Sequence, residues 1–120
     1  EISACLVGSE MCIRDSLISS ISASAAFREG FYGDYYYELV GTCEDGEAYA
    51  RTSVTNRSYT TKVSAEIYRY TTGPLYTNIG PLEGAGSVSF NIPMSLSSFR
   101  MWSHHYINGS LINDLFSSTN

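Results

Sequence analysis

The sequence predicts an all-β protein that folds as a single antiparallel β-sandwich of about seven strands. Tyr, Ser, Thr and Val dominate the chain, and turn residues recur at short intervals. No window carries the 3.6-residue periodicity of a helix. Short stretches of strand-forming residues between regular turn signals are typical of two stacked antiparallel sheets.

The first two expected strands are joined by a short turn. The first is Phe31–Cys43, with three consecutive tyrosines in its middle. Asp45 and Gly46 form the turn, because glycine accepts the positive φ that such turns require. The second strand is Glu47–Thr55, and residues 56–58 turn the chain again.

The third expected strand, Thr60–Tyr70, has the clearest alternation in the chain. One set of side chains is apolar and the other is mostly polar: Val63, Ala65 and Ile67 against Lys62, Ser64, Glu66 and Tyr68. A period of two indicates one buried face and one solvated face.

A short edge strand and a longer inner strand are expected next. Leu75–Ile79 is the edge strand, and the glycine-rich residues 80–86 form a flexible connection. Ser87–Ile92 follows, with Val88, Phe90 and Ile92 directed inward. Residues 93–97 form a loop that leads to the last two expected strands.

The last two strands, Ser98–Ile107 and Ser110–Ser117, are expected to form a hairpin around Asn108 and Gly109. Asn-Gly between two β stretches is the strongest short-range hairpin signal. With these seven strands, the expected architecture is an immunoglobulin-like sandwich.

The N-terminal residues 1–16 resemble a translated sequencing-library adapter. Leu6–Ser16 (LVGSEMCIRDS) matches the arm used in transposase-based library preparation, and the preceding residues fit the flow-cell primer and a sample index. Segments of this origin are excluded from fold reasoning. Two of the three cysteines are thereby set aside, which leaves Cys43.

Residues 17–25 are expected to be the remnant of a signal peptide. Leu17, Ile18 and Ile21 end an apolar stretch, and Ala23-Ser24-Ala25 has the small residues that signal peptidase requires. The alternative is an ordinary Ser/Ala-rich tail. The first interpretation predicts a secreted domain over residues 26–120.

Charge and composition exclude several classes of partner. The whole chain has a net charge of −5, and without residues 1–16 nine acidic and six basic residues leave −3. The basic residues are scattered, so nucleic acid binding has no electrostatic footprint. No apolar stretch is long enough to span a bilayer. A secreted domain with one cysteine has no internal disulfide, so packing must stabilise it.

The closing hairpin carries a candidate catalytic set. If Ile107 pairs with Ser110, the register places His105 opposite Ile112 and Ser103 opposite Asp114, so that Ser103, His105 and Asp114 share one face. This set suggests a hydrolase. A triad also needs an oxyanion hole, and no glycine-rich oxyanion loop is present. The alternative is a hydrogen-bonded network beside Phe99, Met101 and Phe116.

His104 and His105 also raise the question of a metal site. Successive strand residues point to opposite faces, so the two imidazoles do not bind one ion. No cysteine or carboxylate stands at ligand spacing, and no metal or other cofactor is expected. The alternative is cross-strand packing, with Trp102 opposite Leu115 and Tyr106 opposite Leu111.

Four tyrosines form a candidate ligand platform. Tyr35 and Tyr37 share one face of the first strand, and Tyr68 and Tyr70 share one face of the third. Exposed aromatic rings stack on sugar rings or lie at membrane interfaces. The alternative is a purely structural role, since tyrosine is also a good strand former.

The domain resembles uncharacterised small secreted β proteins of Gram-positive bacteria. The matching pieces are Ala23–Ala25, Gly33–Gly41, Ser87–Phe90 and Ser103–His105. It is similar, more weakly, to lactococcin 972-like bacteriocins at Ser97-Ser98 and His104-His105, although Trp102 stands alone where that family has Trp-rich ends.

The expected function is therefore a secreted, non-enzymatic domain that binds an extracellular or cell-envelope ligand. The alternatives are a bacteriocin acting on cell-wall precursors and a small hydrolase that uses Ser103, His105 and Asp114.

Overall fold

The protein consists of β-strands throughout the residues that the structure, a computed structural model, describes, which are 25–44, 46–70 and 73–119. Within these ranges there is no helix, and so none that is long and apolar enough to cross a membrane. The strands are β2 Ala25–Tyr32, β3 Tyr35–Glu44, β4 Glu47–Val54, β5 Thr60–Arg69, β6 Leu75–Ala85, β7 Ser87–Pro93, β8 Phe99–Ile107 and β9 Ser110–Ser118.

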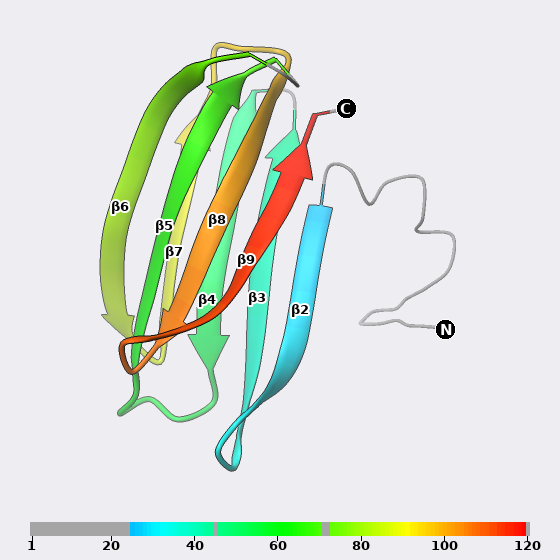
Figure 1. Cartoon of the computed structure of the whole chain (residues 1–120). Coiled ribbons are helices and arrows are strands. Elements are labelled where there is room, and N and C mark those ends of the chain that lie inside the picture. The colour runs from blue at the N-terminus through cyan, green and yellow to red at the C-terminus, as the bar shows by residue number, and fades with distance from the viewer. Residues whose placement is uncertain (1–24, 45, 71–72, 120) are drawn as a thin grey trace, which may run out of the picture.

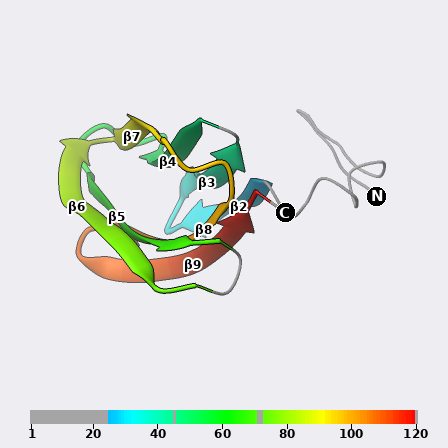
Figure 2. The same cartoon turned by 90° about the horizontal axis from the view of Figure 1, so that it is seen from above.

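The strands form two antiparallel sheets that lie face to face. One sheet has the order β2-β3-β4-β7 and the other the order β6-β5-β8-β9. Figure 1 shows the second sheet in front of the first, and Figure 2 shows the two layers from above. The prediction of an all-β protein with two stacked antiparallel sheets is confirmed.

The core lies between the sheets and is built from the alternating inward residues of the central strands. Val63, Ala65 and Ile67 of β5 are fully or almost fully buried, as their alternation predicts. They pack with Phe99 and Met101 of β8 and with residues of the opposite sheet. The buried residues of this cluster are Cys43, Ala48, Ala50, Val63, Ala65, Ile67, Phe90, Met94, Phe99 and Met101.

The described residues form eight strands where about seven were expected, because an unpredicted strand, β2, precedes β3 and shares only Phe31 and Tyr32 with the predicted first strand. A turn at Gly33 and Asp34 separates β2 from β3, which pair as a hairpin from Tyr32–Tyr35 outward. Gly33 has a φ of 65°, a conformation that glycine adopts without steric cost. The three tyrosines therefore begin a strand and do not occupy the middle of one.

The strand β6 is longer than expected. It continues past Ile79 through the glycine-rich residues that were expected to form a flexible connection, and it ends at Ala85. The pairing with β5 shifts register at Ser64, opposite Gly80 and Pro81. Pro81 lacks an N–H donor, and this is tolerated because β6 is an edge strand, as predicted.

Candidate functional site

The two adjacent histidines of β8 lie on opposite faces of their sheet. His105 has no exposed surface and points between the sheets, whereas His104 is part-exposed on the outer face. This follows from the alternation of side chains along a strand. The two faces of β8 therefore carry two separate polar clusters.

The inner cluster connects the two sheets. His105 Nδ1 lies 2.8 Å from Thr52 Oγ1 of β4, and Nε2 lies 2.8 Å from Ser103 Oγ. The Thr52 hydroxyl donates to the Lys62 carbonyl at 3.2 Å, so it accepts from His105 Nδ1–H. His105 Nε2 then accepts a hydrogen bond from the Ser103 hydroxyl, and each of these polar atoms has a partner.

The environment of His105 keeps its imidazole neutral. Desolvation by burial, with a smaller contribution from the charge of His104, lowers the pKa of His105 to about 4. A neutral ring fits this arrangement, because its Nε2 can accept from the Ser103 hydroxyl, whereas the protonated ring has two donors and no acceptor. The inner cluster is therefore a closed hydrogen-bond network inside the core.

The prediction that Ser103, His105 and Asp114 share one face is wrong. The turn pairs Ile107 with Ser110 and Tyr106 with Leu111 as predicted, but the register then shifts by one residue at Ile112. His105 therefore lies opposite Asn113, and Asp114 lies opposite His104 on the outer face. The extra residue is a β-bulge, and it reverses the facing of every residue that follows it.

Because of the bulge, the expected cross-strand packing of Trp102 on Leu115 is also wrong. Its partner is Phe116, and Leu115 is instead buried between the sheets. The burial pattern explains the bulge, because it places the apolar Leu115 inside and the charged Asp114 outside. Without the extra residue, the carboxylate would enter the core.

Cys43 belongs to the core as well. It is fully buried, and its Sγ lies 3.3 Å from Ser117 Oγ. Burial raises the pKa of the Cys43 thiol to about 11 and outweighs the hydrogen bond to Ser117, which lowers it. The thiol is protonated at neutral pH and has the character of a small packing residue.

The outer face of the β5-β8-β9 region carries aromatic and charged side chains in cross-strand rows. We call this surface the aromatic face. One row contains Glu66, Trp102 and Phe116, and the next contains His104 and Asp114. Its members are Lys62, Glu66, Tyr68, Arg100, Trp102, His104, Tyr106, Asp114 and Phe116.

His104 lies between two carboxylates in the centre of the aromatic face. Its Nδ1 is 2.6 Å from Asp114 Oδ1, and its Nε2 is 2.8 Å from both oxygens of Glu66. Partial burial acts to lower the pKa of His104, but the hydrogen bonds to Asp114 and Glu66 outweigh it and the pKa is raised. Both ring nitrogens are thereby held as donors.

The tyrosine rings of the aromatic face are covered by cations. The Arg100 guanidinium lies 4.4 Å from the Tyr68 ring centroid, and Lys62 Nζ lies 5.0 Å from that of Tyr106. These are cation–π contacts. Trp102 and Phe116 pack on each other with centroids 5.1 Å apart and remain 41% and 42% exposed. They provide the accessible aromatic surface.

The four tyrosines of the predicted platform are divided between the two ends of the sandwich. Tyr35 packs edge-to-face on Tyr59, which precedes β5, at 5.3 Å between centroids. Tyr68 lies near the other end of β5, and a strand of this length spans about 30 Å. Tyr37 covers Gly30 on β2, and Tyr70 is 60% exposed beyond the end of β5 with a φ of 55°. Of the four, Tyr68 belongs to the aromatic face.

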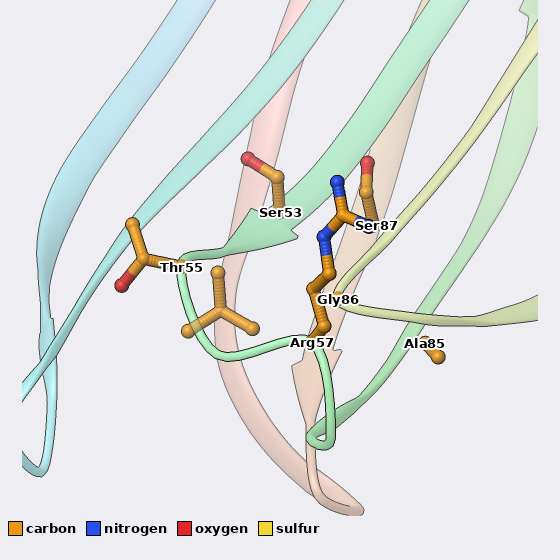
Figure 3. A pocket seen from close by; sticks show the side chains of 7 residues that line it. Ser53, Thr55, Arg57, Ala85, Gly86 and Ser87 are labelled. Carbon is orange, nitrogen blue, oxygen red and sulfur yellow. The ribbon is translucent and has the colours of Figure 1, made fainter.

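A shallow pocket lies at the end of the other sheet, where β4 and β7 meet the β4–β5 loop. It has a volume of about 370 Å³, and its lining includes Ser53, Arg57, Gly86 and Ser87. Figure 3 shows the Arg57 side chain rising from the loop, with its guanidinium between the two serines in this view. The sequence analysis did not identify this site.

The described ranges contain no group of three or more His, Cys, Asp or Glu side chains arranged to hold a metal ion. Comparison of the chain with protein-family models, with curated proteins and with solved structures finds no match.

Sequence reasoning missed the aromatic face because Trp102 and Phe116 meet only after the bulge has shifted the register. A signal was present in the alternation of β9. Leu115 and Asp114 fit a sandwich only with Leu115 inside, which requires one extra residue between them and the turn.

Proposed function

We propose that this chain is a secreted, non-enzymatic, immunoglobulin-like β-sandwich that binds a glycan outside the cell or at its envelope. The observation that carries the proposal is the exposed Trp102–Phe116 pair beside the Glu66–His104–Asp114 cluster on the aromatic face. Secretion rests on the signal-like residues 17–25, of which 17–24 lie outside the described residues.

The strand order supports the immunoglobulin-like part of the proposal. When β2 is set aside, β3 to β9 are seven strands in chain order. In one sheet β4 pairs with β3 and β7, and in the other sheet β8 pairs with β5 and β9. This is the pairing of strands A, B, E and C, F, G in immunoglobulin sandwiches. The remaining strand, β6, pairs with the third strand at the sheet edge.

The chemistry of the aromatic face suits a sugar. Sugar rings have apolar faces that stack on aromatic rings, and Trp102 and Phe116 provide such surface. The hydroxyl groups of a sugar donate hydrogen bonds. The carboxylates of Glu66 and Asp114 can accept further hydrogen bonds beyond the one that each makes to His104. The central carboxylates and the net charge of −3 that remains without residues 1–16 disfavour an anionic membrane surface.

A glycan array identifies the ligand, and titration calorimetry of the best binder tests the site. We expect Trp102→Ala and Phe116→Ala to weaken binding by at least about tenfold each, because truncation of a central aromatic anchor commonly costs 2 kcal/mol or more. Phe31→Ala is the matched control. Phe31 is 70% exposed, but it lies on β2 in the other sheet.

Equal loss in Phe31→Ala and Trp102→Ala would show that the effect is not specific to the aromatic face. The predicted tyrosine platform gives a different result in the same assay. If binding falls in Tyr35→Ala or Tyr37→Ala and persists in Trp102→Ala, the ligand lies on the other sheet and our proposal is wrong.

Two alternatives have weaker support. A hydrolase would use the Ser103–His105 contact, but both side chains are fully buried and Asp114 lies on the opposite face. A nucleophile needs access to substrate. The bacteriocin alternative rests on sequence similarity alone, and a growth-inhibition assay with the purified protein tests it.

A further inference from the structure

A second site, separate from the aromatic face, lies in the pocket beside Arg57. The pocket is at the low end of the volumes typical of small-molecule sites, at about 370 Å³. Its lining combines one guanidinium with two serine side chains, from Ser53 and Ser87, which are cross-strand partners on β4 and β7. Figure 3 shows the three side chains grouped at this end of the sheet.

The loop that carries Arg57 is fixed on both sides. Asn56 Oδ1 accepts from Ser58 N at 2.9 Å, and Gly86 N donates to the Tyr59 carbonyl at 2.8 Å. The Arg57 backbone lies directly over Gly86, where an added Cβ would approach the Arg57 Cα to 3.0 Å. The absence of a side chain at Gly86 therefore lets the loop close on β7 and places Arg57 at the pocket.

The charge of Arg57 is not compensated by any of the residues that the structure describes. No ion pair or hydrogen bond joins its guanidinium to another described residue, and the side chain is exposed. The carboxylate of Glu38, whose residue lies opposite Ser53, is held by Arg51 at 3.1 Å and by the Tyr36 hydroxyl at 3.1 Å. The carboxylate of the residue opposite Ser53 is thus already paired.

We propose that this pocket binds a carboxylate group. A guanidinium and a carboxylate form two parallel hydrogen bonds in one plane, and serine hydroxyls add donors to the remaining lone pairs. The Ser87 side chain is exposed, and the Ser53 hydroxyl makes only a 3.5 Å contact with the Glu38 carbonyl, so both can turn to the ligand.

The charge of the molecule restricts the ligand to a monoanion. A single guanidinium balances one negative charge, and the net charge, which is −3 without residues 1–16, repels polyanions such as nucleic acid or polyphosphate. A small monocarboxylate, or one carboxylate on a larger neutral molecule, meets both conditions. Binding is expected to be weak, in the millimolar range, because one charged pair anchors it at an exposed site.

The test is a two-dimensional amide NMR titration of the full chain with sodium acetate at constant ionic strength. Acetate should cause saturable shifts at the Gly86, Ser87 and Val54 amides, whereas acetamide, a neutral molecule of similar shape, should not. Arg57→Gln should abolish the shifts. Arg28→Gln is the matched control, because Arg28 is exposed on β2 and its substitution removes the same charge at a different place.

The spectra also report whether each variant is folded. Equal shifts with acetamide, unchanged shifts in Arg57→Gln, or no saturable response to acetate would each overturn the proposal. Loss of the response in Arg28→Gln as well would mean that net charge, and not the pocket, attracts acetate. Because the pocket and the aromatic face lie on different sheets, glycan binding and acetate binding succeed or fail independently.

Discussion

At the scale of single residues, His104 and His105 are neighbours whose pKa values are shifted in opposite directions. Carboxylates raise the pKa of His104, and burial lowers that of His105 to about 4. A group with a lowered folded pKa stabilises the fold above its unfolded value, and that stability is lost as the pH falls. A group with a raised folded pKa stabilises the fold at lower pH, and that stability is lost as the pH rises through the folded value.

His105 should therefore destabilise the protein in acid. Between its unfolded pKa of about 6.5 and its folded pKa of about 4, the free energy of unfolding should fall by about 3 kcal/mol on account of this residue. Urea unfolding between about pH 7.5 and pH 4 measures this slope. His105→Gln, which has no titrating ring, should show a correspondingly shallower slope.

Ring NMR titration checks the same prediction in the native state and does not need a variant. The His105 ring should remain neutral to about pH 4, whereas the His104 ring should titrate above its ordinary value of about 6.5. A His105 ring that titrates near 6.5 in the folded protein would contradict the closed network with Thr52 and Ser103.

At the scale of elements, the β8–β9 turn connects its hairpin to a third strand. Asn108 and Gly109 have φ values of 52° and 83°, as a type I′ turn requires. Asn108 Oδ1 accepts from Thr60 N at 3.0 Å, and Asn108 N donates to the Thr60 carbonyl at 2.8 Å. The turn therefore also fixes the start of β5.

Two substitutions at Asn108 separate these roles. Asn108→Gly keeps the positive φ and loses the side-chain acceptor for Thr60, so we expect it to cost about 1 kcal/mol. Asn108→Ala also places a Cβ in the left-handed region, which adds about 1–2 kcal/mol. Urea denaturation of both variants measures the difference. If Asn108→Ala is no less stable than Asn108→Gly, the backbone contribution is absent.

Local sequence patterns predicted where the strands lie better than they predicted which face of the sheet each side chain occupies. The alternation in β5 and the Asn108-Gly109 turn gave the correct buried residues and the correct first pairs of the hairpin. The bulge at Ile112 was not foreseen, because an extra residue leaves strand propensity unchanged and is decided by which side chains the core accepts. That one residue separates the predicted catalytic set from the observed aromatic face.

The turn at Gly33 was missed for a related reason. Gly33 and Asp34 stand between Tyr32 and the three tyrosines, and strong strand formers on both sides suggested one continuous strand. Glycine and aspartate are both turn residues, and together they predict the turn that lets β2 pair with β3. The pocket at Arg57 could not be predicted at all, since β7 reaches it through long-range pairing.

At the scale of the whole molecule, the strand order of the described residues gives each sheet two edge strands, which are β2 and β7 in one sheet and β6 and β9 in the other. Exposed edges pair readily with other chains, and prolines or charges on them oppose this. Pro81 lies within β6, Pro93 ends β7, and β2 carries Arg28 and Glu29. These residues lower the tendency of the free edges to aggregate.

The strand ladders of the described residues lie within residues 25–118, and the core cluster uses strands β3, β4, β5, β7 and β8 together with Met94. Our interpretation of residues 1–16 as adapter-derived and 17–25 as a signal remnant therefore makes a prediction. A chain that begins at Ala25 should match the full chain in free energy of unfolding to within about 0.5 kcal/mol, and in m-value.

A chain that begins at Gly33 is the matched control for this truncation. It also removes β2, whose eight residues pair along β3 from Ala25 to Tyr32. It should lose stability and have a smaller m-value, because less surface is buried on folding. If the chain that begins at Ala25 shows the same loss, the first 24 residues contribute to the fold, and the adapter and signal interpretations both fail.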